Sequence, residues 1–148
     1  MLRIISSFDG GNIEVVKADD PCDIQLNIRQ DTNAEFFQWF YFKVIGVKNT
    51  PCTIKILNAG EASFTRGWEN YKAVASVDQQ YWTRVPTEYE NGILEIQSTP
   101  SSDAVCYAYF VPYPSDRHSE LIARCQASEG VGLSVPGLTK QKRPIEVL

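Results

Sequence analysis

A block of aromatic side chains in the first third of the chain restricts how this sequence can fold. In NAEFFQWFYFKVIGV, six of the seven positions from Phe36 to Phe42 are Phe, Trp or Tyr, and Gln38 is the exception. In an extended strand alternate side chains point to opposite faces, so both faces of this strand would be apolar. The two expected faces are Phe37, Trp39 and Tyr41 on one side, and Phe36, Phe40, Phe42 and Val44 on the other. The sequence therefore predicts a long central strand, one face of which fills the core while the other needs a second cover.

Length, composition and charge exclude several classes of protein. The chain has 148 residues, 43% of them hydrophobic and 22% charged, which is enough for the core of one ordinary domain. Its net charge of -4 comes from 14 basic and 18 acidic residues that are dispersed along the chain. Binding to nucleic acid or to an anionic membrane needs clustered Lys and Arg, so we expect neither partner. The N-terminus has no signal-peptide pattern, and no apolar run approaches the ~20 residues of a membrane span, which favours a cytoplasmic location.

Segments with a period of two, rich in β-branched and aromatic residues, recur along the first 110 residues and indicate about nine strands. They are LRIISS, NIEVV, DIQLNIR, FFQWFYFKVIGV, TIKILNA, KAVASV, WTRV, ILEIQS and AVCYAYF. The stretches between them carry Gly, Pro, Asn or Asp residues suited to reversing a strand. No segment of helical period separates the strands to make a parallel crossover. The sequence therefore predicts an all-β fold, an antiparallel β-sandwich or barrel.

The character of the chain changes after residue 110. FVPYPSDRHSELIARCQAS predicts a turn and then a C-terminal helix, with Ser115 or Asp116 as its N-cap and an apolar stripe at Leu121, Ile122 and Cys125. We expect this helix to cover the second face of the aromatic strand. LSVPGLTKQKRPIEVL then predicts a strand, a turn at TKQKRP and a second strand. A terminal apolar strand without a partner favours a chain that continues into a further domain, and a docked terminal strand is the alternative.

Five segments, in order, carry a resemblance to a known family. They are GGNIEVV, DTNAEFFQWFYFKV, ILNAGEASFTRGWENYKAVAS, YWTRVPTEYENGIL and YAYFVPYPSDRHSELIA. Together they resemble the amino-terminal domain of the cytosolic carboxypeptidase family. This is the branch of zinc metallocarboxypeptidases whose eukaryotic members trim glutamate from tubulin tails, and the compact spacing is most similar to its bacterial members.

The resemblance implies an antiparallel β-sandwich domain over residues 1–113, a connecting helix over 114–128 and, over 129–148, the first strand pair of an α/β carboxypeptidase domain. The family's catalytic domain needs an HxxE pair and a later His to hold zinc, a Glu as general base and an Arg for the terminal carboxylate of the substrate. The chain contains one His, which cannot supply two His ligands. We therefore expect no catalytic residue, metal ligand or cofactor in this chain, and zinc in the catalytic domain of the parent protein.

The function that the resemblance implies is structural. The domain would pack on the C-terminal carboxypeptidase domain of the same protein and shape the access of a peptide or protein substrate to its active site. A stand-alone carbohydrate- or peptide-binding β-sandwich module is the alternative, and a complete small hydrolase with an unfamiliar site is a weaker third hypothesis. Formation of a homo-oligomer is left open.

The loop FTRGWENY offers the most recognisable binding chemistry. Arg66 beside Trp68 and Tyr71 could make an aromatic surface with a cation, which is a common way to hold sugars or peptide side chains. Large aromatic residues are mostly buried, so we favour the interpretation that Trp68 and Tyr71 pack beneath the loop.

Tyr113, Pro114 and His118 are candidates for contact with the next domain. A Tyr ring can pack at a hinge while its hydroxyl stays in water. His118 is expected on the polar side of the helix, and Glu120 would point to a different face. Because a metal site needs convergent ligands, we interpret His118 as a solvated or domain-interface residue.

Other catalytic groupings are weaker. Glu61 and Glu69 flank the segment ASFTRGW, and we expect them to be solvated carboxylates rather than a glycosidase pair. The four cysteines include no CxxC pair, so we expect reduced, mostly buried thiols. A disulfide between Cys22 and Cys52 is left open.

Overall fold

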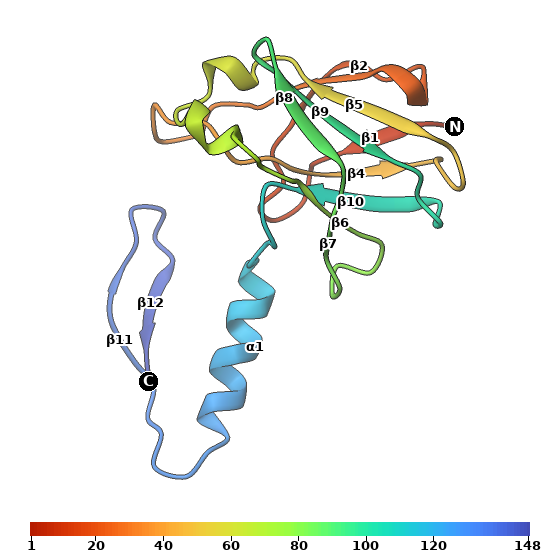
Figure 1. Ribbon diagram of the computed structural model, residues 1–148. Coiled ribbons are helices and arrows are strands. Elements are labelled where there is room, and N and C mark those ends of the chain that lie inside the picture. Colours follow the sequence, from red (N-terminus) through yellow and green to blue (C-terminus); the bar gives the residue numbers. More distant parts are fainter. The chain divides into compact units, whose positions relative to one another are not determined.

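The computed structural model describes residues 1–148 and divides the chain into two compact units, Met1–Pro112 and Tyr113–Leu148 (Figure 1). The first unit consists of strands and short 3-10 helices, and the second of one α-helix and a two-stranded hairpin. None of the helices is long and apolar enough to span a membrane.

Two five-stranded sheets make up the first unit. The first sheet has the strand order β1 (Arg3–Ile5), β4 (Tyr41–Ile45), β10 (Ala104–Ala108), β6 (Val74–Ser76) and β7 (Thr83–Arg84). The second has the order β2 (Glu14–Lys17), β3 (Ile24–Asn27), β5 (Cys52–Ile56), β9 (Ile93–Ser98) and β8 (Thr87–Glu90). The 3-10 helices are η1 (Pro21–Asp23), η2 (Ala59–Glu61) and η3 (Thr65–Trp68). The predicted β-rich class is thereby confirmed.

The larger of two buried clusters is formed by side chains from both sheets. On the second sheet the alternate residues of β3, β5 and β9 point inward, as their sequence pattern predicts. The fully buried members of these three strands are Ile24, Leu26, Ile54, Ile56, Leu94 and Ile96. Phe42 and Val44 of β4 and Tyr107 of β10 belong to the same core cluster, so it is shared between the sheets.

One strand, β8, was missed because TEYE carries two glutamates and only four residues. It pairs with β9 as a hairpin through Asn91 and Gly92. These two residues have φ values of 52° and 82°, the left-handed conformation that a two-residue type I′ turn requires. An Asn-Gly pair before the apolar segment ILEI is a strong hairpin signal and could have identified β8.

The expectation of an entirely antiparallel fold is wrong at one pair of strands. β3 and β5 are parallel, with Ile24 opposite Ile54 and Leu26 opposite Ile56. The chain leaves the second sheet after β3, runs through the first sheet as β4, and returns to the second sheet as β5. A strand in the opposite layer thus makes the crossover that a helix makes in βαβ units.

The aromatic block is only partly a strand. Regular pairing begins at Tyr41, and the residues from Phe36 to Phe40 lie outside β4. This segment bonds to a loop instead: the Phe37 N–H donates to Ser63 Oγ at 2.8 Å. The Gln38 amide accepts from the Phe64 N–H at 3.0 Å and donates to the Phe64 carbonyl at 3.2 Å. These bonds take the place of pairing with a neighbouring strand. The predicted long strand therefore lacks its first half, and β4 begins only at Tyr41.

The second face of β4 is covered within the first unit. Tyr41 is 3% exposed and forms a separate buried cluster with Val74, Cys106 and Ala108. Phe8 packs edge-on against Tyr41 with ring centroids 4.8 Å apart, and Trp39 and Trp82 border the same cluster. The apolar second face of β4 is therefore covered by residues of the first unit, whereas we expected from the sequence that the helix after residue 110 would cover it.

Trp68 also belongs to the core. Its side chain is 2% exposed, and its indole N–H donates to the carbonyl of Ala59 at 2.9 Å. The rings of Tyr71 and Tyr109 meet it edge-on at centroid distances of 5.3 and 5.4 Å. A fully buried indole with a satisfied N–H stabilises the loop that carries it.

An ionic cluster joins three strands of the second sheet. The Asp23 carboxylate, just before β3, accepts from Lys17 of β2 at 2.8 Å and from Lys55 of β5 at 3.0 Å. Gln25 donates to the same carboxylate at 2.9 Å. The bonds from Lys17, Gln25 and Lys55 lower the pKa of Asp23 well below its usual range.

The second unit contains α1 (Ser115–Gln126) and an antiparallel hairpin of β11 (Ser134–Leu138) and β12 (Pro144–Val147). The helix begins at Ser115, so the prediction of Ser115 or Asp116 as the N-cap is wrong. The N-cap is Pro114, which makes no side-chain capping bond. Asp116 lies in the first turn, where its charge complements the helix dipole. Ile122 is the buried residue of the helix.

We predict that Trp68→Ala lowers the free energy of unfolding by about 3–5 kcal/mol, because it leaves a large cavity in the core. Urea denaturation of the 148-residue chain measures this loss. Arg66→Ala, in the same 3-10 helix but exposed, is the matched control and should stay within about 0.5 kcal/mol of the parent sequence. Equal stability of the Trp68 and Arg66 variants would show that the indole does not support the core.

Asp23→Asn is predicted to cost stability at neutral pH but not in acid. A carboxylate whose folded pKa is depressed contributes stability above its unfolded pKa of about 3.9, and loses it as the pH falls below that value. The stability difference between the two chains should therefore be constant above about pH 5 and narrow below about pH 4. Urea midpoints between pH 7 and pH 3 measure it, and a gap that does not change with pH would contradict the ionic role.

Candidate functional site

The residues of the loop FTRGWENY do not form a common surface. Trp68 is enclosed in the core, and the Tyr71 hydroxyl donates to the carbonyl of Tyr109 at 2.5 Å. Burial raises the pKa of Tyr71 far above its ordinary value, so the phenol is neutral. Arg66 is exposed. Of the three candidates, Arg66 is therefore exposed and Tyr71 partly exposed, whereas Trp68 presents almost no surface to solvent.

The candidates after residue 112 lie together in the second unit. The Arg117 guanidinium is 5.7 Å from the centre of the Tyr113 ring, and Pro114 caps α1. His118 Nε2 lies 3.0 Å from Glu146 Oε2 of β12, and its ring is 6.4 Å from that of Tyr113. The contact with Glu146 ties the helix to the hairpin. Nowhere in the chain do three His, Cys, Asp or Glu side chains gather as a metal site would require.

Three phenylalanines of neighbouring segments are exposed, Phe36, Phe64 and Phe110, with exposed fractions of 71%, 59% and 55%, and we refer to them together as the aromatic patch. Phe64 belongs to the loop that is hydrogen-bonded to Gln38, two residues after Phe36. The Phe110 ring packs on Trp39 with centroids 4.8 Å apart. The sequence predicts an aromatic face that needs a cover, but it does not single out Phe36, Phe64 and Phe110 as the exposed residues. Its chemistry suits apolar packing against another protein surface.

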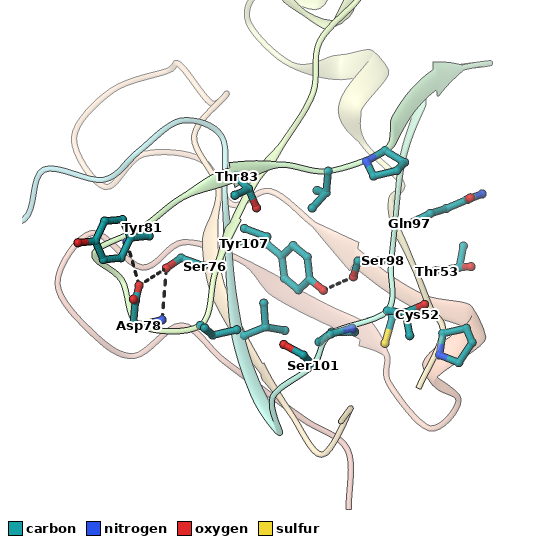
Figure 2. Close-up of a pocket in the computed structure, with 18 residues that line it drawn as sticks. Cys52, Thr53, Ser76, Asp78, Tyr81, Thr83, Gln97, Ser98, Ser101 and Tyr107 are labelled. Atoms are coloured by element: carbon teal, nitrogen blue, oxygen red, sulfur yellow. Dashed lines mark hydrogen bonds between the residues drawn. The ribbon is translucent and has the colours of Figure 1, made fainter. Parts of the chain in front are cut away.

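A cavity of about 730 Å³ is the second feature of the first unit (Figure 2). Its walls come from β6, β7 and β10 of the first sheet and from the start of β5 and the end of β9 in the second. Tyr107 and Cys52 line it, although they are 0% and 3% exposed. Its floor is therefore formed by residues of the core that the two sheets share.

The cavity is almost uncharged. Of the 18 residues that line it, Asp78 alone has an ionisable carboxylate, and none is Lys, Arg or His. The N–H groups of Tyr81 and Gln80, each 2.9 Å from Asp78 Oδ1, hold the pKa of Asp78 below its ordinary value. Burial raises the pKa of Tyr107 to about 12, and its hydroxyl shares a hydrogen bond with Ser98.

The four cysteines are free thiols. Cys52 and Cys106 are buried, Cys125 is half-buried and Cys22 is exposed. Burial raises the pKa of both Cys52 and Cys106, so neither is a thiolate at neutral pH. A buried thiol of this kind does not act as a nucleophile.

Comparison with known proteins gives a consistent result over almost the whole chain. Residues 4–110 match the family described as the cytosolic carboxypeptidase N-terminal domain. An uncharacterized protein of Zymomonas mobilis is 41% identical over 147 residues, which are 99% of this chain and 38% of that protein.

Solved structures of bacterial metallo-carboxypeptidases are also similar to this chain. A metallo-carboxypeptidase from Burkholderia cenocepacia has a TM-score of 0.95 and 39% identity, covering 99% of this chain and 38% of that one. A metallo-carboxypeptidase from Pseudomonas aeruginosa, solved in complex with (2-guanidinoethylmercapto)succinic acid, has a TM-score of 0.90 and 40% identity, covering 97% and 39%. The chain thus spans less than two fifths of the length of these relatives. With the family match over residues 4–110 and this level of identity, the chain belongs to the cytosolic carboxypeptidase N-terminal domain family.

Proposed function

We propose that residues 1–148 are the amino-terminal part of a zinc metallocarboxypeptidase that removes C-terminal amino acids from peptides or proteins in the cytoplasm. In this proposal residues 1–113 are a non-catalytic β-sandwich, residues 114–128 are a connecting helix, and residues 129–148 begin the α/β catalytic domain. Support comes from one combined observation: the chain matches the N-terminal domain of the family and covers only 38% of a metallo-carboxypeptidase.

The hairpin of the second unit supports a continuation into a larger sheet. Val135 and Leu138 of β11 are 52% and 60% exposed, and Ile145 and Val147 of β12 are 45% and 47% exposed. A two-stranded hairpin with exposed apolar side chains is marginally stable in water and gains stability from further strands or a covering helix. The segment of the parent protein that follows Leu148 is the partner we propose for it.

The aromatic patch is the surface that we propose packs on the catalytic domain. Phe110 lies two residues before the end of the first unit, so this member of the patch is close in sequence to the point where the chain leaves that unit. Burying an exposed Phe side chain contributes about 1.5–3 kcal/mol, and three such residues are enough to favour a fixed interface. In that position the domain would shape the path of a substrate to the active site.

The zinc chemistry belongs to the remainder of the parent in this proposal. A zinc peptidase holds its metal with three protein ligands, and the metal lowers the pKa of bound water. The chain has one His, and that residue pairs with Glu146. We therefore propose that this chain contributes packing and orientation, while the catalytic domain binds zinc and the substrate carboxylate.

We predict that the full-length parent releases C-terminal residues from peptides in a reaction that a zinc chelator abolishes, whereas the 148-residue chain releases none. Mass spectrometry of a peptide mixture measures the products. Zinc bound stoichiometrically to the 148-residue chain, or peptide release by it, would contradict the assignment of all catalytic groups to the remainder.

Phe64→Ser tests the packing surface. We predict that it lowers the thermal midpoint of the full-length parent by several degrees more than that of the 148-residue chain, because only the parent buries the side chain, at about 1.5–3 kcal/mol. Tyr81→Ser is the matched control, since Tyr81 is 82% exposed and lies outside the patch. Equal effects of Phe64→Ser in both chains would exclude the patch as the interface.

A further inference from the structure

The cavity between the two sheets has a physical cause in the side chains around it. The one side chain of β6 in the interlayer core is Ala75, and β7 has only two residues. Small side chains and a short edge strand leave the space between the layers unfilled at this corner, whereas the rest of the interlayer is closed by Ile, Leu and Phe. The resulting volume of about 730 Å³ lies within the range of roughly 300–1,000 Å³ that small-molecule sites occupy.

Polar groups are placed where they can orient a bound molecule. At the floor of the cavity the hydroxyl of Tyr107, a side chain that is 0% exposed, shares one hydrogen bond with Ser98 Oγ, which is partly exposed (Figure 2). The Ser98 hydroxyl retains hydrogen-bonding capacity beyond this bond. The side chains of Thr53, Thr83 and Ser101 add hydroxyls to an otherwise apolar lining.

The charges of the lining select the class of ligand. A phosphate or carboxylate ligand needs Lys, Arg, a backbone nest or a metal to offset its loss of hydration, and no cationic side chain lines the cavity. The Asp78 carboxylate adds a negative charge at the turn that also carries the exposed Tyr81. An anion would therefore be repelled, and a neutral molecule would not.

We propose that this cavity is a binding site for a small neutral molecule with an apolar, aromatic-sized body and a polar group that reaches Ser98. Its residues belong to the first unit alone, so the site does not depend on the catalytic function proposed above.

Two dyes with one scaffold test the proposal directly. N-phenyl-1-naphthylamine is neutral, and its 8-sulfonate carries one negative charge on the same rings. Fluorescence titration of the 148-residue chain should show saturable one-to-one binding of the neutral dye and at least a tenfold weaker affinity for the sulfonate. Equal affinities, or no binding of the neutral dye, would overturn the proposal.

Variants locate the binding within the cavity. Ser101→Phe, which fills the cavity from its exposed rim, should weaken neutral-dye binding at least tenfold. Ser102→Phe, on the adjacent residue that does not line the cavity, should leave it unchanged. Thr83→Phe obstructs the cavity from β7. It replaces Ser101→Phe as the test variant if Ser101→Phe lowers the thermal midpoint of the chain. Loss of dye binding in Phe64→Ser, with retention in both obstructing variants, would assign the dye to the aromatic patch and overturn the proposal.

Asp78→Asn tests the charge argument. An amide keeps an oxygen that can accept from the Tyr81 and Gln80 N–H groups, but it removes the negative charge. The affinity for the sulfonate should therefore rise toward that of the neutral dye, while the affinity for the neutral dye changes less than threefold. An unchanged ratio of the two affinities would show that Asp78 does not select the ligand.

Discussion

The pairing of β4 with β10 is the contact on which the rest of the first unit depends. Phe42 lies directly opposite Tyr107 in this pair, and their rings stack with centroids 5.6 Å apart. The next residues along, Tyr41 and Ala108, face the other side of the sheet and are buried there. Both faces of this strand pair are thus covered by aromatic side chains. A slip by one residue would move these side chains to the wrong faces, so the covering fixes the register of β4 against β10.

Both candidate sites follow from this central pair. The strand β10 ends at Ala108 and is followed by Tyr109 and Phe110, whose rings contact each other. Phe110 is exposed and belongs to the aromatic patch. Tyr107 itself lines the cavity, next to the small Ala75 of β6. The two candidate sites differ in kind: the patch is an exposed apolar surface, and the cavity has room for a molecule of limited size.

The strands could be located from the sequence because alternation of polar and apolar residues is a local signal. Each of the nine predicted segments overlaps an observed strand, and the Asn91–Gly92 turn would have added the tenth. The parallel pairing of β3 with β5 was not accessible in this way, since it depends on β4 lying in the other layer. Trp68 and Arg66 are two residues apart in one loop, and only the packing of Tyr71 and Tyr109 decides that the first is buried and the second exposed.

The sequence by itself determined the β-rich class, the position of the helix and the terminal hairpin, and, through its resemblance to a family, the kind of protein to which the domain belongs. These properties reside in local periodicity and in ordered motifs, which a single chain displays directly. Only the tertiary structure decided where the aromatic block divides, with Phe36 in solvent and Tyr41 and Phe42 in two separate clusters. It also decided that a cavity opens beside Tyr107. Both outcomes depend on which distant side chains meet across the layers, and contacts of that kind leave no periodic trace in the sequence.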